Sequence, residues 1–185
     1  MVERKNNMEY IKFIPNVTFA FREGDIAPKG GGCPIGGEFV FKTANELFGD
    51  RRVIIFSLPG AFTPTCSTYQ LPGFEEQYND FKAQGIDEVY CISVNDAFVM
   101  NQWAHGLGIK NVKVIPDGAG KFTKLMDMLV DMSDIGFGYR SHRYAAVISS
   151  GKVERMFKEP DSSKDDPDPY GVSSPDNVMK YLQGE

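Results

Sequence analysis

A short, mostly apolar run at residues 53–58 limits most strongly how this chain can fold. The run is rich in β-branched side chains and lacks polar alternation, which is typical of a strand buried on both faces. Such a strand needs a layer of structure on each side of its sheet. Pro59-Gly60 ends the run, and apolar residues then recur at helical spacing from Leu71 to Phe81. The segment therefore predicts a buried strand followed by an amphipathic helix, which Pro72 should kink near its start.

The same alternation of strand and helix continues along the chain. Residues 89–94 and 112–115 predict two further short strands. Each is followed by an apolar stripe at helical spacing, the first at residues 98–103 and the second at 122–129. Asp96 is placed to cap the first of these helices.

The last part of the chain predicts a hairpin and a final helix. Residues 144–149 and 153–157 are strand-like and meet at Ser150-Gly151, a pair typical of a hairpin turn. Ser174-Pro175 supplies an N-cap and a first-turn proline for the helix. Between them, the acid-rich residues 161–169 lack the spacing and the glycine of a calcium loop, so they predict a solvated loop rather than a metal site.

This order of elements predicts one α/β domain over residues 1–185. A thioredoxin-like fold satisfies it, with parallel strand pairs and an antiparallel hairpin at one side. A length of 185 residues also favours a single domain. The chain begins with an irregular N-terminal extension, which holds one weak strand pattern at 17–22 and a glycine-rich loop at 30–37.

Charge and cysteine content narrow the classes of partner and compartment. The chain has 25 acidic and 20 basic residues, so its net charge of −5 disfavours nucleic acid and anionic membranes as partners. The longest apolar run, residues 144–148, is far shorter than the roughly 20 residues of a membrane span, and the start lacks a signal-peptide core. Three cysteines, Cys33, Cys66 and Cys91, are too few for a disulfide framework. We therefore expect a protein of the reducing cytoplasm.

Cys66 occupies the position with the most chemical interest. It lies where the buried strand passes through a loop into the helix, at the sheet edge where α/β proteins bind ligands. A thiol in the first turn meets unpaired N–H groups and the positive end of the helix dipole, and both favour the thiolate. We therefore expect the Cys66 sulfur to be ionised at the mouth of a shallow cleft. The alternative, a buried core cysteine, suits Cys91 better, because Cys91 stands in mid-strand between Tyr90 and Ile92.

The segment at residues 59–67 resembles the peroxiredoxin signature. Pro59, Thr63 and Cys66 match its Pro-x-x-x-Thr-x-x-Cys pattern. The whole block, Pro-Gly-Ala-Phe-Thr-Pro-Thr-Cys-Ser, resembles an atypical branch of the AhpC/TSA superfamily of redoxin domains. That branch includes plant type II peroxiredoxins and bacterial enzymes fused to a glutaredoxin.

Two further blocks, at residues 91–100 and 143–145, resemble the same branch. The resemblance runs from about Gly36 to about Leu182, which is most of the chain. It implies a thiol-dependent peroxidase that reduces hydrogen peroxide and alkyl hydroperoxides through a sulfenic acid on Cys66. It implies neither a metal nor an organic cofactor.

The resemblance also implies roles for four site residues. Cys66 supplies the thiolate that attacks one peroxide oxygen. Thr63 hydrogen-bonds the peroxide or the sulfur, and Pro59, with no N–H and a fixed φ, shapes and shields the pocket wall. Arg143 suits both thiolate and peroxide through its permanent charge and several donors, with Arg140 as a second candidate.

The chain departs from relatives that resolve the sulfenic acid with a C-terminal cysteine, because no cysteine follows Cys91. Cys33 and Cys91 remain candidates for an internal disulfide. We favour a one-cysteine cycle, in which glutathione caps the sulfenic acid and glutaredoxin or a second glutathione removes it; thioredoxin is the alternative reductant. Relatives form dimers, so a homodimer is expected, with Phe62 and Phe98 as candidate contact residues.

Three other functions suit the residues less well. A thioredoxin-like exchange enzyme needs a cysteine where Thr63 stands. A Cys–His hydrolase needs His105 or His142 as its base, and the spacing supports neither. We expect His105 at the surface, while His142 is a candidate for the pocket rim. A redox sensor could keep the same site residues, whereas a binding module would show no fast consumption of peroxide.

Overall fold

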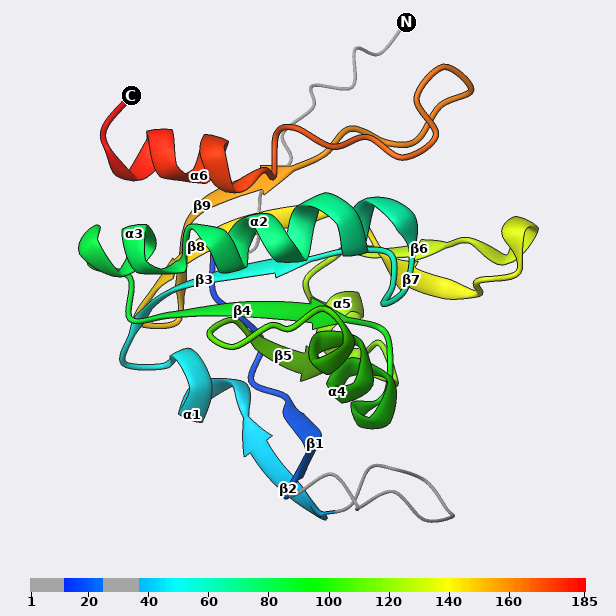
Figure 1. The fold of residues 1–185 in the computed structure, drawn as a ribbon, viewed down its shortest axis with the longest axis horizontal. Coiled ribbons are helices and arrows are strands. Elements are labelled where there is room, and N and C mark those ends of the chain that lie inside the picture. Colours follow the sequence, from blue (N-terminus) through cyan, green and yellow to red (C-terminus); the bar gives the residue numbers. More distant parts are fainter. Residues whose placement is uncertain (1–11, 25–36) are drawn as a thin grey trace, which may run out of the picture.

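The computed structural model describes residues 12–24 and 37–185, which form a central sheet with structure on both faces (Figure 1). Its five strands follow the order β5-β4-β3-β8-β9. They are β3 (Arg52–Ser57), β4 (Glu88–Ser93), β5 (Lys113–Pro116), β8 (Tyr144–Ser149) and β9 (Lys152–Lys158). The pairs β3–β4 and β4–β5 are parallel, whereas β8 pairs antiparallel with both β3 and β9. The predicted α/β class, with parallel pairs and a hairpin at one side, is confirmed.

The alternating side chains of β3 explain why both faces of the sheet are covered. Ile54 and Phe56 point to one face, and Val53 and Ile55 point to the other; all four are fully buried. The first face packs against α2 (Leu71–Glu76), α3 (Tyr78–Ala83), α4 (Ala97–Gly106) and α6 (Pro175–Leu182). The second face packs against β1 (Thr18–Glu23), α1 (Ala44–Phe48) and α5 (Lys121–Leu125).

The predicted turn and caps are confirmed. The β8–β9 turn places Ser150 and Gly151 at φ 47 and 74, the left-handed pair that a two-residue hairpin requires. The Asp96 side chain accepts from the backbone N–H groups of Phe98 and Val99 at the start of α4. Ser174 caps α6 in the same way.

The helix predicted over 71–81 is interrupted. A π-helical segment, η1 (Cys66–Gln70), precedes the predicted range, and the Leu71 N–H donates to the Cys66 carbonyl. Pro72 follows in the first turn of α2, and proline cannot donate the usual i→i−4 bond, so a widened turn precedes it. A second break at Gln77 separates α2 from α3, and the sequence pattern did not predict it.

The helix predicted over 122–129 is shorter than its apolar stripe. α5 ends at Leu125, and Asp127 adopts a left-handed φ of 56 that stops the helix. Leu129 belongs instead to β6 (Leu129–Asp131), which pairs antiparallel with β7 (Tyr139–Ser141). The prediction was wrong there because backbone pairing with β7, the next strand along the chain, outweighed local helical spacing.

Four short elements had no counterpart among the predictions. They are β2 (Glu38–Thr43), which pairs with β1, together with α1, β6 and β7. A 3₁₀ turn, η2 (Ser133–Ile135), lies in the β6–β7 connection. Strands of three residues carry no readable period.

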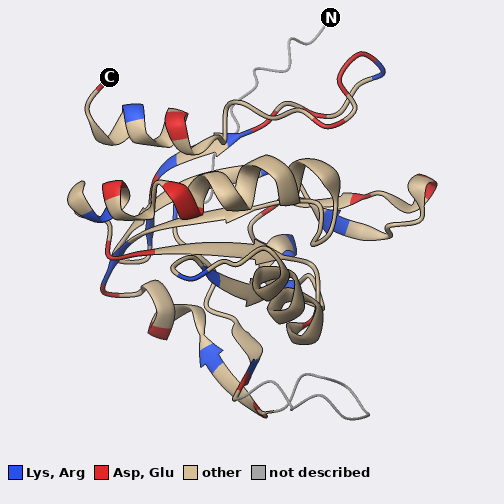
Figure 2. Ribbon diagram, in the orientation of Figure 1, with Lys and Arg blue, Asp and Glu red and all other residues tan. Residues whose placement is uncertain are grey.

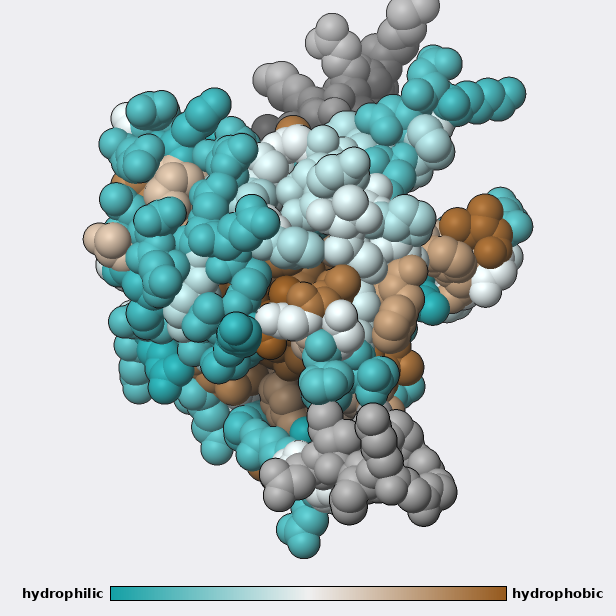
Figure 3. Space-filling model, viewed as in Figure 1, coloured by the Kyte–Doolittle hydropathy of each residue, from teal (hydrophilic) through white to brown (hydrophobic). Residues whose placement is uncertain are grey.

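Charged residues are spread over the molecule, whereas one exposed apolar group stands out. Figure 2 shows acidic and basic residues interspersed along the described chain. Figure 3 shows apolar atoms at the tip of the β6–β7 connection, which holds the exposed Ile135 and Phe137. Among the described residues, we find no helix that combines the length and the apolar character of a membrane span.

Truncating the core between β3 and α2 should cost much stability. Phe56 and Phe74 are fully buried and stack with ring centroids 4.1 Å apart. We expect Phe56→Ala to lower the free energy of unfolding by about 3–5 kcal/mol, measured by urea denaturation. The matched control is Phe41→Ala, because that ring is 66% exposed. A similar loss in the two variants would contradict the packing described here.

Candidate active site

The topology brings three separate segments to one edge of the sheet. Because β3 and β4 are parallel, the residues that follow their carboxyl ends emerge on the same side. Strand β8 runs antiparallel to β3, with Tyr144 opposite Ser57. Arg143, one residue before β8, therefore lies at the edge where the loop from Pro59 to Cys66 begins.

Side-chain hydrogen bonds hold that loop in place. The Asn95 Oδ1 atom accepts from the Ala61 N–H at 3.0 Å and from the Ser93 hydroxyl at 2.7 Å. The Thr63 hydroxyl donates to the Gly60 carbonyl at 2.8 Å. Phe62 has a φ of 64, a left-handed conformation that suggests tight constraint by its neighbours. The loop thus enters the first helical turn in a defined geometry.

Cys66 lies deeper than the sequence predicted. We expected the sulfur at the mouth of a shallow cleft, but its side chain is fully buried among core residues that include Ile54 and Phe56. Cys66 is buried because the segment that carries it packs against the sheet, and Arg143 approaches the sulfur. The polar environment of the thiol is therefore supplied by a side chain rather than by bulk water.

Arg143 contacts the sulfur directly. Its Nη1 atom lies 3.4 Å from the Cys66 Sγ atom, and the residue is only 4% exposed. Burial by itself lowers the pKa of Arg143, but the neighbouring Cys66 sulfur and the Asp168 carboxylate outweigh burial and raise it above the usual value. The guanidinium is therefore charged, and a cation at this distance stabilises negative charge on sulfur.

Three further residues surround the guanidinium, and the sequence did not predict them. Nη1 also donates to the Gln70 Oε1 atom, and Nη2 donates to the Asp168 carboxylate. The Tyr170 ring lies 5.7 Å from the guanidinium carbon. Gln70 stands four residues after Cys66, a spacing that could have placed it on the same helical face. Asp168 carried no such signal, because it lies in the segment predicted to be a solvated loop.

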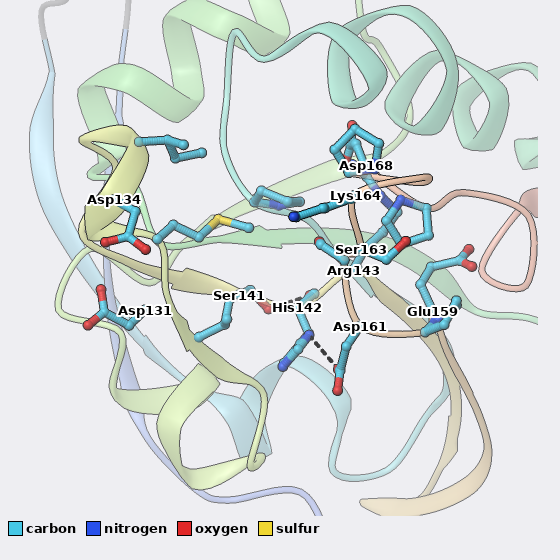
Figure 4. A pocket seen from close by; sticks show the side chains of 18 residues that line it. Asp131, Asp134, Ser141, His142, Arg143, Glu159, Asp161, Ser163, Lys164 and Asp168 are labelled. Atoms are coloured by element: carbon cyan, nitrogen blue, oxygen red, sulfur yellow. Dashed lines mark hydrogen bonds and ion pairs between the residues drawn. The ribbon is translucent and has the colours of Figure 1, made fainter.

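A cavity of about 1010 Å³ opens beside this cluster (Figure 4). Pro59 and Arg143 form part of its wall, and the β6–β7 hairpin and residues 159–169 form much of the rest. His142 also lines it, with Nδ1 3.8 Å from a carboxylate oxygen of Asp161. Burial and the nearby Lys158 lower the pKa of His142, which Asp161 and Asp127 partly offset. The cavity gives an organic molecule room next to Arg143.

The other residues that the sequence singled out differ in burial and in hydrogen bonding. Pro59 is buried and Thr63 is half-buried. Arg140 donates to the backbone carbonyls of Val94 and Phe137, at 3.2 and 3.0 Å, and its Nη1 atom packs close to Gly60. His105 is exposed, as predicted.

The two candidate dimer contacts and the other two cysteines also have distinct positions. Phe62 is 62% exposed, whereas Phe98 is half-buried against the Phe39 ring. Cys91 is fully buried, as predicted, and burial raises the pKa of its thiol well above the usual value. Cys33 lies outside the described residues.

The described residues form no candidate metal centre. Over residues 12–24 and 37–185, no three His, Cys, Asp or Glu side chains gather in a metal-binding group. The site is instead a single sulfur beside one buried guanidinium. Such an arrangement can hold a thiolate and stabilise charge on a small molecule that the sulfur attacks.

Known proteins share this sequence and fold. The redoxin family model matches residues 36–172. A peroxiredoxin from Rhizobium etli is 54% identical over 173 residues, 93% of this chain and 95% of the relative. A hybrid peroxiredoxin from Haemophilus influenzae is 46% identical over 171 residues, 92% of this chain and 65% of the relative.

Solved structures agree with the sequence comparison. The crystal structure of a Plasmodium falciparum antioxidant protein, titled a 1-Cys peroxiredoxin, matches with a TM-score of 0.82 and 36% identity, over 94% of this chain and 98% of that chain. The predicted thioredoxin-like fold is thereby confirmed. With the redoxin model matching most of its length and a relative more than half identical to it, the chain belongs to the peroxiredoxin family of thiol-dependent peroxidases in the AhpC/TSA superfamily.

Proposed function

We propose that this peroxidase reduces hydrogen peroxide and alkyl hydroperoxides, with Cys66 as the attacking thiolate and Arg143 as its electrostatic partner. The observation that carries the proposal is the 3.4 Å contact between the Arg143 Nη1 atom and the Cys66 Sγ atom. The cavity beside Arg143 supports a range of substrates, because it leaves space for the organic group of a hydroperoxide.

The chemistry follows from that contact. A sulfur lone pair attacks one peroxide oxygen, a new S–O bond forms, and the O–O bond breaks. The sulfur is oxidised to a sulfenic acid while the peroxide is reduced; the leaving oxygen takes up a proton and departs as water or an alcohol. Arg143 stabilises the charge that develops on the leaving oxygen. In this proposal Thr63 offers its hydroxyl to the peroxide or the sulfur, and Pro59 walls the pocket off from water.

A one-cysteine cycle completes the proposed turnover. Glutathione attacks the sulfenic acid, which forms a mixed disulfide and releases water. A thiolate of glutaredoxin, or a second glutathione, then attacks the glutathione sulfur and frees Cys66 as a thiolate. Burial of Cys91 supports this cycle, because a thiol with a raised pKa is a poor internal nucleophile. The similarity to a hybrid peroxiredoxin and to a 1-Cys peroxiredoxin lends further support.

The proposed enzyme needs no metal or organic cofactor and acts as a homodimer in the cytoplasm. Support for the dimer comes from Phe62, a large apolar ring that is 62% exposed in the loop next to the site. An exposed ring of this kind is typical of a contact surface.

Removing the guanidinium should slow the peroxide step. We expect Arg143→Ala to lower the second-order rate constant for hydrogen peroxide by about 100- to 1,000-fold, because a preorganised charge partner is lost. Stopped-flow fluorescence of Trp103 can follow the reaction, since its indole N–H donates to the hydroxyl of Ser67, next to Cys66. Cys66→Ser should abolish the fast phase, and Arg51→Ala, an exposed arginine, should leave it unchanged. A fast phase that survives in Cys66→Ser would refute the proposed nucleophile.

Mass spectrometry should identify the recycling route. After one equivalent of peroxide and excess glutathione, we expect one glutathione on Cys66, and glutaredoxin should remove it. Turnover with glutathione and glutaredoxin should persist in Cys33→Ser and Cys91→Ser. An intrachain disulfide between Cys66 and either cysteine would instead contradict the one-cysteine cycle, and faster turnover with thioredoxin would contradict the choice of reductant.

Sedimentation should report the assembly. We expect wild type at micromolar concentration to sediment at twice the mass of one chain. Phe62→Asp should shift it toward the single chain, because a charge would be buried in the contact. Tyr69→Asp is a useful comparison, since Tyr69 is similarly exposed. A single-chain mass for wild type would rule out the dimer.

A further inference from the structure

The segment between Glu159 and Ser173, here called the strap, lies against the active site, although the sequence of residues 161–169 within it predicts only a solvated loop. The strap forms one side of the cavity next to Arg143, and Figure 4 shows Asp168 of the strap close to Arg143. Nothing in the peroxide chemistry described above uses a strap residue. Its contacts with the guanidinium therefore call for a separate explanation.

Both ends of the strap are fixed to the sheet beside the site. The backbone N–H of Glu159 donates to the Arg143 carbonyl at 3.1 Å. The Glu159 carboxylate, only 4% exposed, accepts from the N–H groups of Gly171 and Ser173 at 2.7 Å and from the Ser173 hydroxyl at 2.8 Å. The strap thus begins and ends at a clamp next to Arg143, which limits how far its middle can move.

The chain around Asp168 is also stiff. Pro167 precedes it and Pro169 follows it. Proline fixes its own φ and restricts the residue before it, so the backbone of Asp168 has few conformations to lose on ordering. Pro169 is buried, and Tyr170 next to it lies near both the guanidinium and the ring of Tyr69, at 5.7 and 6.5 Å. These features hold the Asp168 carboxylate in one place.

Asp168 meets a need that the catalytic contact creates. A guanidinium that is 4% exposed requires opposite charge and hydrogen-bond acceptors, or its burial is costly. Cys66 supplies negative charge only as a thiolate, and a sulfenic acid in its neutral form or a mixed disulfide does not. Gln70 is neutral at every stage. Of the three groups that accept from Arg143, only Asp168 is an anion that stays in place when the sulfur reacts.

We propose that Asp168 is a positioning residue, which holds the Arg143 guanidinium in its orientation toward the Cys66 sulfur throughout the catalytic cycle. Nη2 donates to the Asp168 carboxylate, and with Nη2 held there Nη1 points at the Cys66 sulfur and at Gln70. The inference rests on the proposed peroxidase function and adds to it a residue that touches neither sulfur nor substrate.

Two substitutions separate the hydrogen bond from the charge. Asp168→Ala removes both, and we expect the second-order rate constant for hydrogen peroxide to fall about 10- to 100-fold, as for other losses of orientation in an active site. Asp168→Asn keeps an oxygen acceptor of the same shape and loses only the charge, so its rate constant should lie between those of Asp168→Ala and wild type. Asp165→Ala, an exposed carboxylate of the same strap, is the matched control and should react like wild type.

A second measurement excludes a merely structural role. The rate of Cys66 alkylation by iodoacetamide, followed as a function of pH, reports the thiolate without needing a peroxide. In a background of Cys33→Ser and Cys91→Ser, we expect the Asp168→Ala profile to differ from wild type. A variant that only unfolds more readily would keep the wild-type profile in its folded fraction and add a second phase from unfolded chains.

The outcomes are distinguishable. If wild type fails to consume peroxide rapidly, the proposed function is wrong. If wild type reacts and Asp168→Ala reacts equally fast, with an unchanged alkylation profile, only the positioning role is wrong. Equal losses in Asp168→Asn and Asp168→Ala would also overturn it, because the hydrogen bond that orients the guanidinium would then contribute nothing.

Discussion

The contact between the Arg143 guanidinium and the Cys66 sulfur requires a buried cation, and removing a cation from water costs free energy. Such a group persists only where acceptors and opposite charge offset most of the cost of its burial. Much of the surrounding structure serves this need: Gln70 from the helical segment of Cys66 and Asp168 from the strap both accept from it. The Nε atom of Arg143 has no partner among the protein atoms described, and it is buried. In a peroxidase, a free donor of this kind is suited to an incoming oxygen.

The sheet determines where these groups meet. Parallel pairing of β3 and β4 brings the loop from Pro59 and the side chain of Asn95 to one edge, and antiparallel pairing of β8 returns Arg143 to it. Hydrogen bonds between the loop and Asn95 then hold the first turn of the helix, and with it the sulfur. Cys66 therefore lies in a first helical turn and Arg143 directly before a paired strand, and such fixed positions suit preorganised electrostatic stabilisation.

Two buried cysteines show how much the neighbours matter. Cys66 and Cys91 are both fully buried and belong to the same core cluster. Burial raises the pKa of the Cys91 thiol, since it stands in the middle of β4. Cys66 stands at the start of a helical segment, and the Arg143 Nη1 atom lies 3.4 Å from its sulfur. Burial therefore does not by itself make a cysteine inert; what decides is whether a positive charge is buried with it.

Local patterns in the sequence determined the α/β class, most strands and helices, the capping residues and the position of Cys66 at a strand-to-helix junction, because each depends on neighbours along the chain. The same patterns failed for the end of α5, where Leu129 belongs to the β6–β7 hairpin, and for η1, whose widened turn precedes Pro72. Only the tertiary structure decided that Cys66 is buried, that Arg143 reaches it across 77 positions of sequence, and that Asp168 of a polar loop binds the guanidinium. Those contacts follow from strand order and register, and from one residue that two prolines flank in a clamped strap. None of these features has a periodic signature that a single sequence displays.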